Sequence, residues 1–232
     1  MRQVVLDTET TGLEVELEHR IIEIGCVEIL NRRITGRSFH RFLNPERDID
    51  EGAVEVHGLT RERLAKEPRF ADICEELLDF VRDAELLIHN AAFDLSFLDA
   101  ELARSQRAER IGALCKVQDT LALARQMHPG QRNSLDALCK RYSVDNSRRD
   151  YHGALLDARL LADVYLAMTG GQATLVLSAE PEMVARLDVG GGPSLAVPIP
   201  VIRASEEELH AHEQVLALLD KASAGKTVWR AL

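Results

Sequence analysis

Alternating apolar and polar positions near the N-terminus predict three strands. Val4 to Leu6 form a short apolar run, and residues 20–30 and 34–43 alternate over longer stretches. Because the three segments follow one another closely, we expect an antiparallel meander. It should end at Asn44-Pro45, since proline cannot donate a hydrogen bond to a neighbouring strand.

After the meander, the pattern changes to helices that alternate with short strands. Apolar residues recur at helical spacing from Phe70 to Val81, residues 85–90 form a short apolar strand, and residues 94–105 form another amphipathic helix. Lys116-Val117 would be one more edge strand. This order predicts parallel strands after the meander, and therefore an α/β fold.

Polar residues mark several expected helix ends. Thr60 and Ser134 are placed as N-caps, and another helix should start near residue 119 or 120 and stop at Pro129-Gly130. A long helix reaches Met168, and the glycines at 170 and 171 predict a left-handed C-cap there.

The composition changes after residue 171. Residues 172–204 contain a run of three glycines and several prolines, which is typical of a linker. Ser205 and Glu208 form a capping-box pattern before a last helix, to about Ala222, that would present apolar residues. We expect three parts: a domain over 1–171, a linker over 172–204, and a docking segment over 205–232. In the alternative, the last part folds back onto the domain. The apolar residues of the last helix are Leu209, Val215, Leu216 and Leu219, and the only tryptophan is Trp229.

Composition and charge narrow the class of protein. The chain of 232 residues is 46% hydrophobic and has a formal net charge of −10, which argues against binding long nucleic acid through a basic surface. Four cysteines lack metal-binding spacing, so free thiols are expected. Without a signal peptide or an apolar run of membrane-spanning length, a cytoplasmic protein is expected.

Carboxylates at predicted element ends are the candidate chemistry. Asp7 and Glu9 leave the first strand on one face, where two like charges are tolerated if a cation lies between them. Oxygen ligands of this kind suit Mg²⁺ or Mn²⁺ better than zinc. Asp94 follows another strand, and His152 precedes Asp157 by five residues, an offset of about 140° on an ideal helix. Both can serve one site only if His152 lies at the edge of the helix, beside Gly153.

Three sequence motifs contain these candidate residues. Residues 7–12, 89–94 and 152–158 resemble the three exonuclease motifs of the DnaQ-like 3′-5′ exonucleases that have four acids and a catalytic histidine. Gly153, where another subclass has tyrosine, places the chain in the histidine group. The resemblance extends over nearly the full length to the family members that proofread for bacterial replicative polymerases. It implies a ribonuclease H-like fold, with a mixed five-stranded sheet and helices on both sides.

The resemblance also implies roles for the site residues. Asp7 would bridge two divalent metal ions, Mg²⁺ or Mn²⁺. Glu9 and Asp157 would hold the first ion, Asp94 would hold the second, and His152 would take a proton from the attacking water. The terminal nucleotide of a DNA 3′ end would contact a further set of residues: Thr8, Glu9, Leu13, His57 and Phe93.

Partner contacts are implied for the C-terminal third. Residues 172–177, with Gln172, Leu175 and Leu177, resemble a peptide that binds the sliding clamp. The segment with Trp229 resembles the part that binds the polymerase catalytic (alpha) subunit. Whether a small stabilising subunit binds the catalytic domain is left open by the sequence.

Three functions are therefore compared. The first is a proofreading 3′-5′ DNA exonuclease within a replicase, which releases 5′-mononucleotides. The second is a free-standing exonuclease on RNA or short oligonucleotides, which the tether and Trp229 disfavour. The third is a catalytically idle bridge between polymerase and clamp, which the intact set of acids and His152 disfavours.

Overall fold

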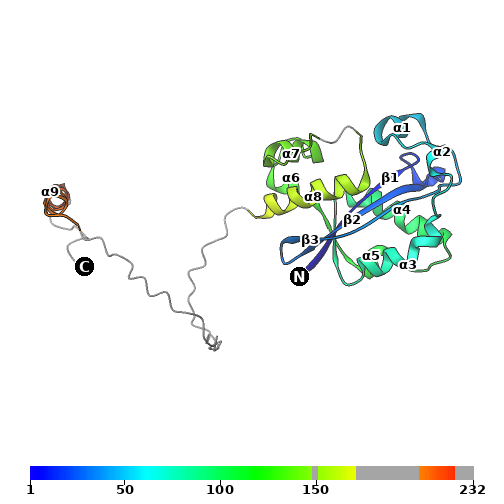
Figure 1. The fold of residues 1–232 in the computed structure, drawn as a ribbon, viewed down its shortest axis with the longest axis horizontal. Coiled ribbons are helices and arrows are strands. Elements are labelled where there is room, and N and C mark those ends of the chain that lie inside the picture. The colour runs from blue at the N-terminus through cyan, green and yellow to red at the C-terminus, as the bar shows by residue number, and fades with distance from the viewer. Residues whose placement is uncertain (148–150, 171–203, 223–232) are drawn as a thin grey trace, which may run out of the picture. The chain divides into compact units, whose positions relative to one another are not determined.

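The computed structural model describes residues 1–147, 151–170 and 204–222, and divides the chain into two compact units, Met1–Leu177 and Ser178–Leu232. The first unit contains a mixed five-stranded sheet with strand order β3-β2-β1-β4-β5 (Figure 1). β1 pairs antiparallel with β2, and β2 with β3, whereas β1–β4 and β4–β5 are parallel. The expected meander and the parallel strands after it are confirmed. The strands are β1 (Arg2–Thr10), β2 (Ile21–Leu30), β3 (Arg33–Phe42), β4 (Glu85–Ile88) and β5 (Lys116–Asp119).

The helices largely follow the periodic segments. Thr60 Oγ1 accepts from the N–H of Arg63 and Ser134 Oγ from that of Ala137, which confirms both N-caps. Two short helices, η1 (Val15–Leu17) and α5 (Ile111–Leu114), were not predicted. The other helices of the first unit are α1 (Glu51–His57), α2 (Arg61–Leu64), α3 (Phe70–Val81), α4 (Ala91–Arg104), α6 (Thr120–Met127), α7 (Leu135–Tyr142) and α8 (Ala154–Thr169).

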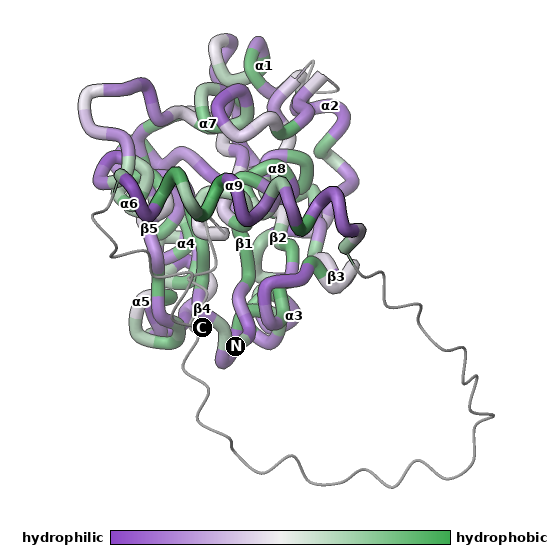
Figure 2. The backbone as a smooth tube through the Cα atoms, turned by 90° about the vertical axis from the view of Figure 1, so that its left-hand side faces the viewer, coloured by the Kyte–Doolittle hydropathy of each residue, from purple (hydrophilic) through white to green (hydrophobic). Residues whose placement is uncertain are grey.

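Alternation along β1 builds a core on each face of the sheet. Val4 and Leu6 pack with residues of α3 and α4, whereas Val5 packs with residues of α8. Figure 2 shows hydrophobic stretches along β1, β2 and β4 in the middle of this unit. Asp7 and Glu9 share the face of Val5 and therefore lie on the side of α8, while Thr8 lies on the side of α4.

Helix α8 approaches the sheet closely at Gly25, the antiparallel partner of Asp7. A Cβ atom at Gly25 would lie 2.2 Å from the main-chain nitrogen of Leu155, so only glycine fits there without movement. Since Asp7 is paired with Gly25 and Asp157 lies in the first turn of α8, the contact at Gly25 sets the distance between the strands and the start of the helix.

The end of α8 differs from the prediction. Gly170, its C-cap, has φ −89° and is not left-handed, so the predicted glycine cap is wrong at this residue; Gly171 lies outside the described residues. Arg32 provides the alternative, because its guanidinium donates to the carbonyl oxygen of Leu166 at 2.9 Å and to Thr169 Oγ1 at 3.0 Å. A cationic side chain thus caps the last turn.

The described part of the second unit is the stretch 204–222, with α9 (Glu206–Ala222). The capping box is confirmed: Ser205 Oγ accepts from the N–H of Glu208, whose carboxylate accepts from the N–H of Ser205. Leu209, Val215 and Leu219 are exposed, while Leu216 is buried. Gln172, Leu175, Leu177 and Trp229 lie outside the described residues. In the stretches that are described, no helix is long and apolar enough to cross a membrane.

Candidate active site

A cavity of about 620 Å³ lies at the end of β1 and collects residues from three distant parts of the chain. Asp7, Glu9, Asp94, His152 and Asp157 all line it. β1 brings the first two, the first turn of α4 brings Asp94, and the start of α8 brings the last two. The structure therefore brings together the five residues that the sequence singled out as one site.

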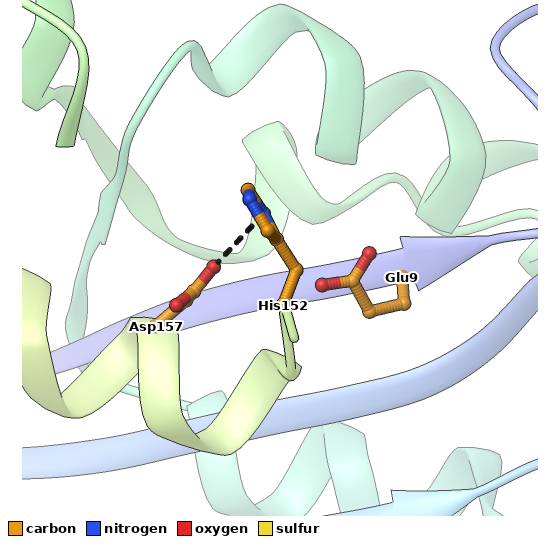
Figure 3. A group of neighbouring side chains, drawn as sticks. All are labelled: Glu9, His152 and Asp157. Atoms are coloured by element: carbon orange, nitrogen blue, oxygen red, sulfur yellow. Dashed lines mark ion pairs between the residues drawn. The ribbon is translucent and has the colours of Figure 1, made fainter. Parts of the chain in front are cut away.

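Three of these side chains are close enough to share a ligand. One atom each from Glu9, His152 and Asp157 lies within 4.8 Å of the others, the arrangement of a candidate metal-binding group (Figure 3). His152 Nδ1 lies 3.5 Å from Asp157 Oδ2. With Asp7 and Asp94 on the same cavity, four carboxylates face one space, and such a set of oxygen atoms suits a hard divalent cation.

Asp94 is deeply buried, with 4% of its surface exposed, as is Asp157. Burial raises the pKa of Asp94 to about 7, although the hydrogen bond from Thr8 opposes that shift. Thr8 Oγ1 donates to Asp94 Oδ1 at 2.7 Å. Helix α4, which carries Asp94, starts at Ala91, three residues earlier than predicted. Asp94 therefore lies in the first turn of the helix rather than at its N-terminal end.

His152 precedes α8, as its spacing from Asp157 requires. The helix starts at Ala154, and its N-cap Gly153 has an extended conformation, with φ −154° and ψ 127°. The main-chain N–H of His152 donates to the carbonyl oxygen of Val56 at 3.0 Å. The imidazole is thus presented by a loop that is attached to another part of the site.

The far wall of the cavity consists of polar residues to which the sequence assigned no role. His89 is held by a contact of 3.0 Å between its Nδ1 and Thr120 Oγ1, and burial lowers its pKa. No pattern in the sequence analysis singled out Gln131, Asn133 or Asp136 for a role in the site. The side chains on this wall are His89, Asn90, Arg125, Gln131, Asn133, Ser134 and Asp136.

A second cavity, of about 410 Å³, adjoins the first, because Thr8, Glu9 and Phe93 line both. All the residues predicted to contact a nucleotide line it, including Leu13 and His57. Leu13 is 81% exposed, which excludes a core role for it, whereas Phe93 packs on Phe97 with ring centroids 4.9 Å apart.

His57 is oriented by the main chain. Its Nδ1 accepts from the N–H of Leu59 at 3.0 Å, which leaves Nε2 to carry the proton of a neutral ring. Burial lowers the pKa of His57, so the ring is neutral at pH 7. Nε2 is buried and has no hydrogen-bond partner among the described residues. His57 therefore lines the second cavity as a neutral ring.

Comparison with known proteins identifies the family of the chain. A protein family described as "Exonuclease" matches residues 4–165. The chain is 51% identical to a protein of Salmonella typhimurium named DNA polymerase III subunit epsilon, and the alignment covers 99% of this chain and 98% of that protein. The protein of the same name from Escherichia coli is 49% identical with the same coverage, and that of Rickettsia prowazekii is 45% identical over 93% of this chain and 96% of its own length.

Solved structures show the same fold. Exonuclease X in complex with a 5′ overhanging duplex DNA superposes with a TM-score of 0.55 at 24% identity, covering 73% of this chain and 92% of that one. A zinc-bound complex of Escherichia coli exonuclease I with single-stranded DNA gives a TM-score of 0.65 at 17% identity, covering 74% of this chain and 41% of that one.

Proposed function

The chain belongs to the exonuclease family, with proteins named DNA polymerase III subunit epsilon among its relatives, and from this we propose that it is a proofreading 3′-5′ DNA exonuclease. It would remove mismatched nucleotides from primer ends as a subunit of the replicative polymerase and release 5′-mononucleotides. The observation that carries the proposal is the convergence of four acids and His152 on one cavity, next to a second cavity lined by apolar and polar side chains.

The carboxylates fit a pair of divalent cations, Mg²⁺ or Mn²⁺. Asp7 would contact both ions, Glu9 and Asp157 would hold one, and Asp94 the other. When bound, the ions would lower the pKa of the attacking water, stabilise the leaving 3′ oxygen and neutralise charge on the phosphate. The grouping of ligand atoms from Glu9, His152 and Asp157 supports this assignment.

His152 would act as the general base. Its Nδ1 faces Asp157, and its ring lies on the same cavity as the carboxylates, within reach of a water held there. A neutral imidazole can accept a proton from an attacking water. The loop before α8 thus presents a base without adding another negative charge to the site.

The second cavity would hold the 3′-terminal nucleotide. Leu13 and Phe93 offer apolar surface to a base, Thr8 and Glu9 line both cavities, and His57 forms another part of the wall. A nucleotide in this position would place the phosphate that links it to the next nucleotide at the four acids. Glu9 would then reach its 3′-hydroxyl.

The C-terminal segment would provide the attachment to the replicase. Leu209, Val215 and Leu219 are exposed apolar residues of α9, which suits a helix that binds in a groove of a partner. We assign the polymerase catalytic subunit to the segment 205–232 and the sliding clamp to residues 172–177, on a domain that ends near residue 171. An anchored nuclease needs no basic surface of its own, which accommodates the net charge of −10.

The test is a primer labelled at its 5′ end and carrying a mismatched 3′ nucleotide, incubated with Mg²⁺ or with a chelator. Wild type should shorten it one nucleotide at a time only when metal is present, and Asp7→Asn should not. Asp79→Asn, which alters an exposed acid paired with Arg82, is the matched control and should behave as wild type. Full activity in Asp7→Asn, or preference for an RNA primer, would contradict the proposal.

A further inference from the structure

Helix α1 is connected by its main chain to both halves of the active site. At its start, the N–H of Asp50 donates to the carbonyl oxygen of Thr11, two residues after Glu9, at 3.0 Å. At its end, the carbonyl oxygen of Val56 accepts from the N–H of His152 at 3.0 Å. The helix therefore spans from the loop after β1 to the loop before α8, as Figure 1 lets the reader follow.

Helix α1 itself is only lightly packed among the described residues. His57 is the one residue of the helix that is buried, so α1 contributes little to the cores on the two faces of the sheet. Its described attachments are the hydrogen bonds at its ends, the His57 ring, and the flanking residues Ile49 and Leu59, which belong to a small separate cluster. An element of this kind can shift by small amounts at low cost, whereas α4 and α8 cannot.

Tyr151 adds a side-chain contact at the same end. Gly58, the C-cap of α1, has φ +69°, and a Cβ atom there would lie 3.3 Å from Cδ1 of the Tyr151 ring. The ring therefore lies directly against the turn that ends α1. Tyr151 is 60% exposed and is not among the lining residues of either cavity.

The same helix forms a wall of the second cavity. Gly52, Ala53, Val56 and His57 line it from α1, opposite Leu13. Val56 thus contributes to the wall of the nucleotide cavity and, through its carbonyl oxygen, fixes the main chain of His152. A shift of α1 on binding a nucleoside would therefore also move the main chain of His152.

We propose that α1 is a positioning element, held against His152 by Tyr151, through which a nucleoside in the second cavity places the catalytic histidine for reaction. Tyr151 is the positioning residue. The inference rests on the proposed function, since it assigns the second cavity to the terminal nucleotide. A nucleoside group in the substrate therefore raises the rate of the chemical step as well as the affinity for the substrate.

Two chromogenic substrates separate this effect from catalysis in general. The 4-nitrophenyl ester of thymidine 5′-monophosphate carries a nucleoside, whereas bis(4-nitrophenyl) phosphate has none. For Tyr151→Ala, we expect kcat on the nucleoside ester to fall about tenfold with KM within about twofold, and the rate on the simple diester to stay at the wild-type value. Tyr151→Phe keeps the ring and should restore kcat.

Three results for Tyr151→Ala would overturn the proposal. The first is an unchanged kcat on the nucleoside ester, the second is a higher KM with the same kcat, and the third is an equal loss of rate on both substrates. If wild type hydrolyses neither substrate with Mg²⁺, the proposed function itself fails; if wild type is active and Tyr151→Ala matches it, only the coupling fails. Glu55→Gln, an exposed change on α1 outside the cavity lining, is the matched control.

A second measurement reports the hydrogen bond directly. Exchange of the His152 amide proton, followed by NMR, should slow when thymidine 5′-monophosphate and Mg²⁺ are added to wild type, and should change less in Tyr151→Ala. Gly58→Ala, whose methyl group would press on the Tyr151 ring, should act in the same direction if Tyr151→Ala fails to fold. An exchange rate that nucleotide leaves unaltered in wild type would exclude the coupling.

Discussion

Thr8 donates a hydrogen bond of 2.7 Å to Asp94, and this bond joins the strand that carries two acids of the site to the helix that carries a third. Asp94 is buried, and the donor partly offsets the effect of burial on its pKa. The pKa of Asp94 therefore depends on an uncharged hydrogen-bond donor, the hydroxyl group of Thr8.

Replacing that donor should alter the pH dependence of activity. Thr8→Val keeps the shape but removes the hydroxyl, so the pKa of Asp94 should rise further and the acid limb of the rate profile should move up by about one pH unit. Thr8→Ser retains the donor and should keep the wild-type limb. Rates between pH 5.5 and 9 at a fixed, subsaturating Mg²⁺ concentration measure this, and a limb that Thr8→Val leaves in place would refute the role of the bond.

The stability of the metal-free protein should fall as pH rises. The folded state holds the Asp94 proton up to about pH 7, whereas an unfolded aspartate loses it near pH 4, so the folded state binds more protons in between. The contribution is fully present below about pH 4 and is lost as pH rises through about 7, a change of a few kcal/mol at most.

Urea unfolding in chelator at several pH values measures this dependence. Asp94→Asn cannot titrate, so its unfolding free energy should be flatter between pH 5 and 8 and higher than that of wild type at pH 8. Mg²⁺ should restore stability to wild type at high pH and not to the variant. Equal slopes for the two proteins would show that another group is responsible.

Gly25 should be intolerant of even one added methyl group. Gly25→Ala would push α8 away from β2, which should cost about 1–3 kcal/mol of stability and, by displacing Asp157, lower activity about a hundredfold. Gly112→Ala is the matched control, because nothing lies within 4 Å of a Cβ atom there. Primer shortening and thermal unfolding of both variants distinguish a local effect from a general one, and wild-type activity in Gly25→Ala would contradict the spacing argument.

A buried ion pair should contribute to stability without affecting catalysis. Arg20 donates from Nε and Nη2 to Glu101 at 2.6 and 2.8 Å, and Glu101 is almost fully buried. Arg20→Ala removes both short contacts and leaves Glu101 only the longer ones from Arg104 and the Ile21 N–H, at 3.7 and 3.4 Å. It should cost at most about 3–5 kcal/mol, while adding Glu101→Leu should recover part of the loss. Chemical unfolding checks the cost; assays at low temperature should show both variants active, and a double variant less stable than Arg20→Ala would contradict this.

Much of the fold was predictable because apolar periodicity reports directly on burial. The alternation of Val4, Val5 and Leu6 between two cores is the physical origin of the first strand. The short helices η1 and α5 carry too few residues for a period to emerge. The predicted cap at Gly170 failed because its substitute, Arg32, is more than a hundred residues away in sequence.

The site was predictable only in part for a similar reason. Asp7, Glu9, Asp94, His152 and Asp157 are of types that carry chemistry, and a family resemblance grouped them before the structure placed them on one cavity. The link between Val56 and His152 is made by main-chain atoms, which every residue has, so no side-chain pattern signals it.

The close contact at Gly25 has a consequence for how such enzymes are surveyed. Mutational scans that truncate side chains detect residues whose side-chain atoms are needed for function. Glycine has no side chain to truncate. An alanine scan that omits glycines would not test Gly25, where alanine adds a methyl group instead of removing atoms. In this nuclease fold, the close approach of a helix to one strand residue is as much a determinant of geometry as the carboxylates beside it, and only substitutions that add atoms will detect it.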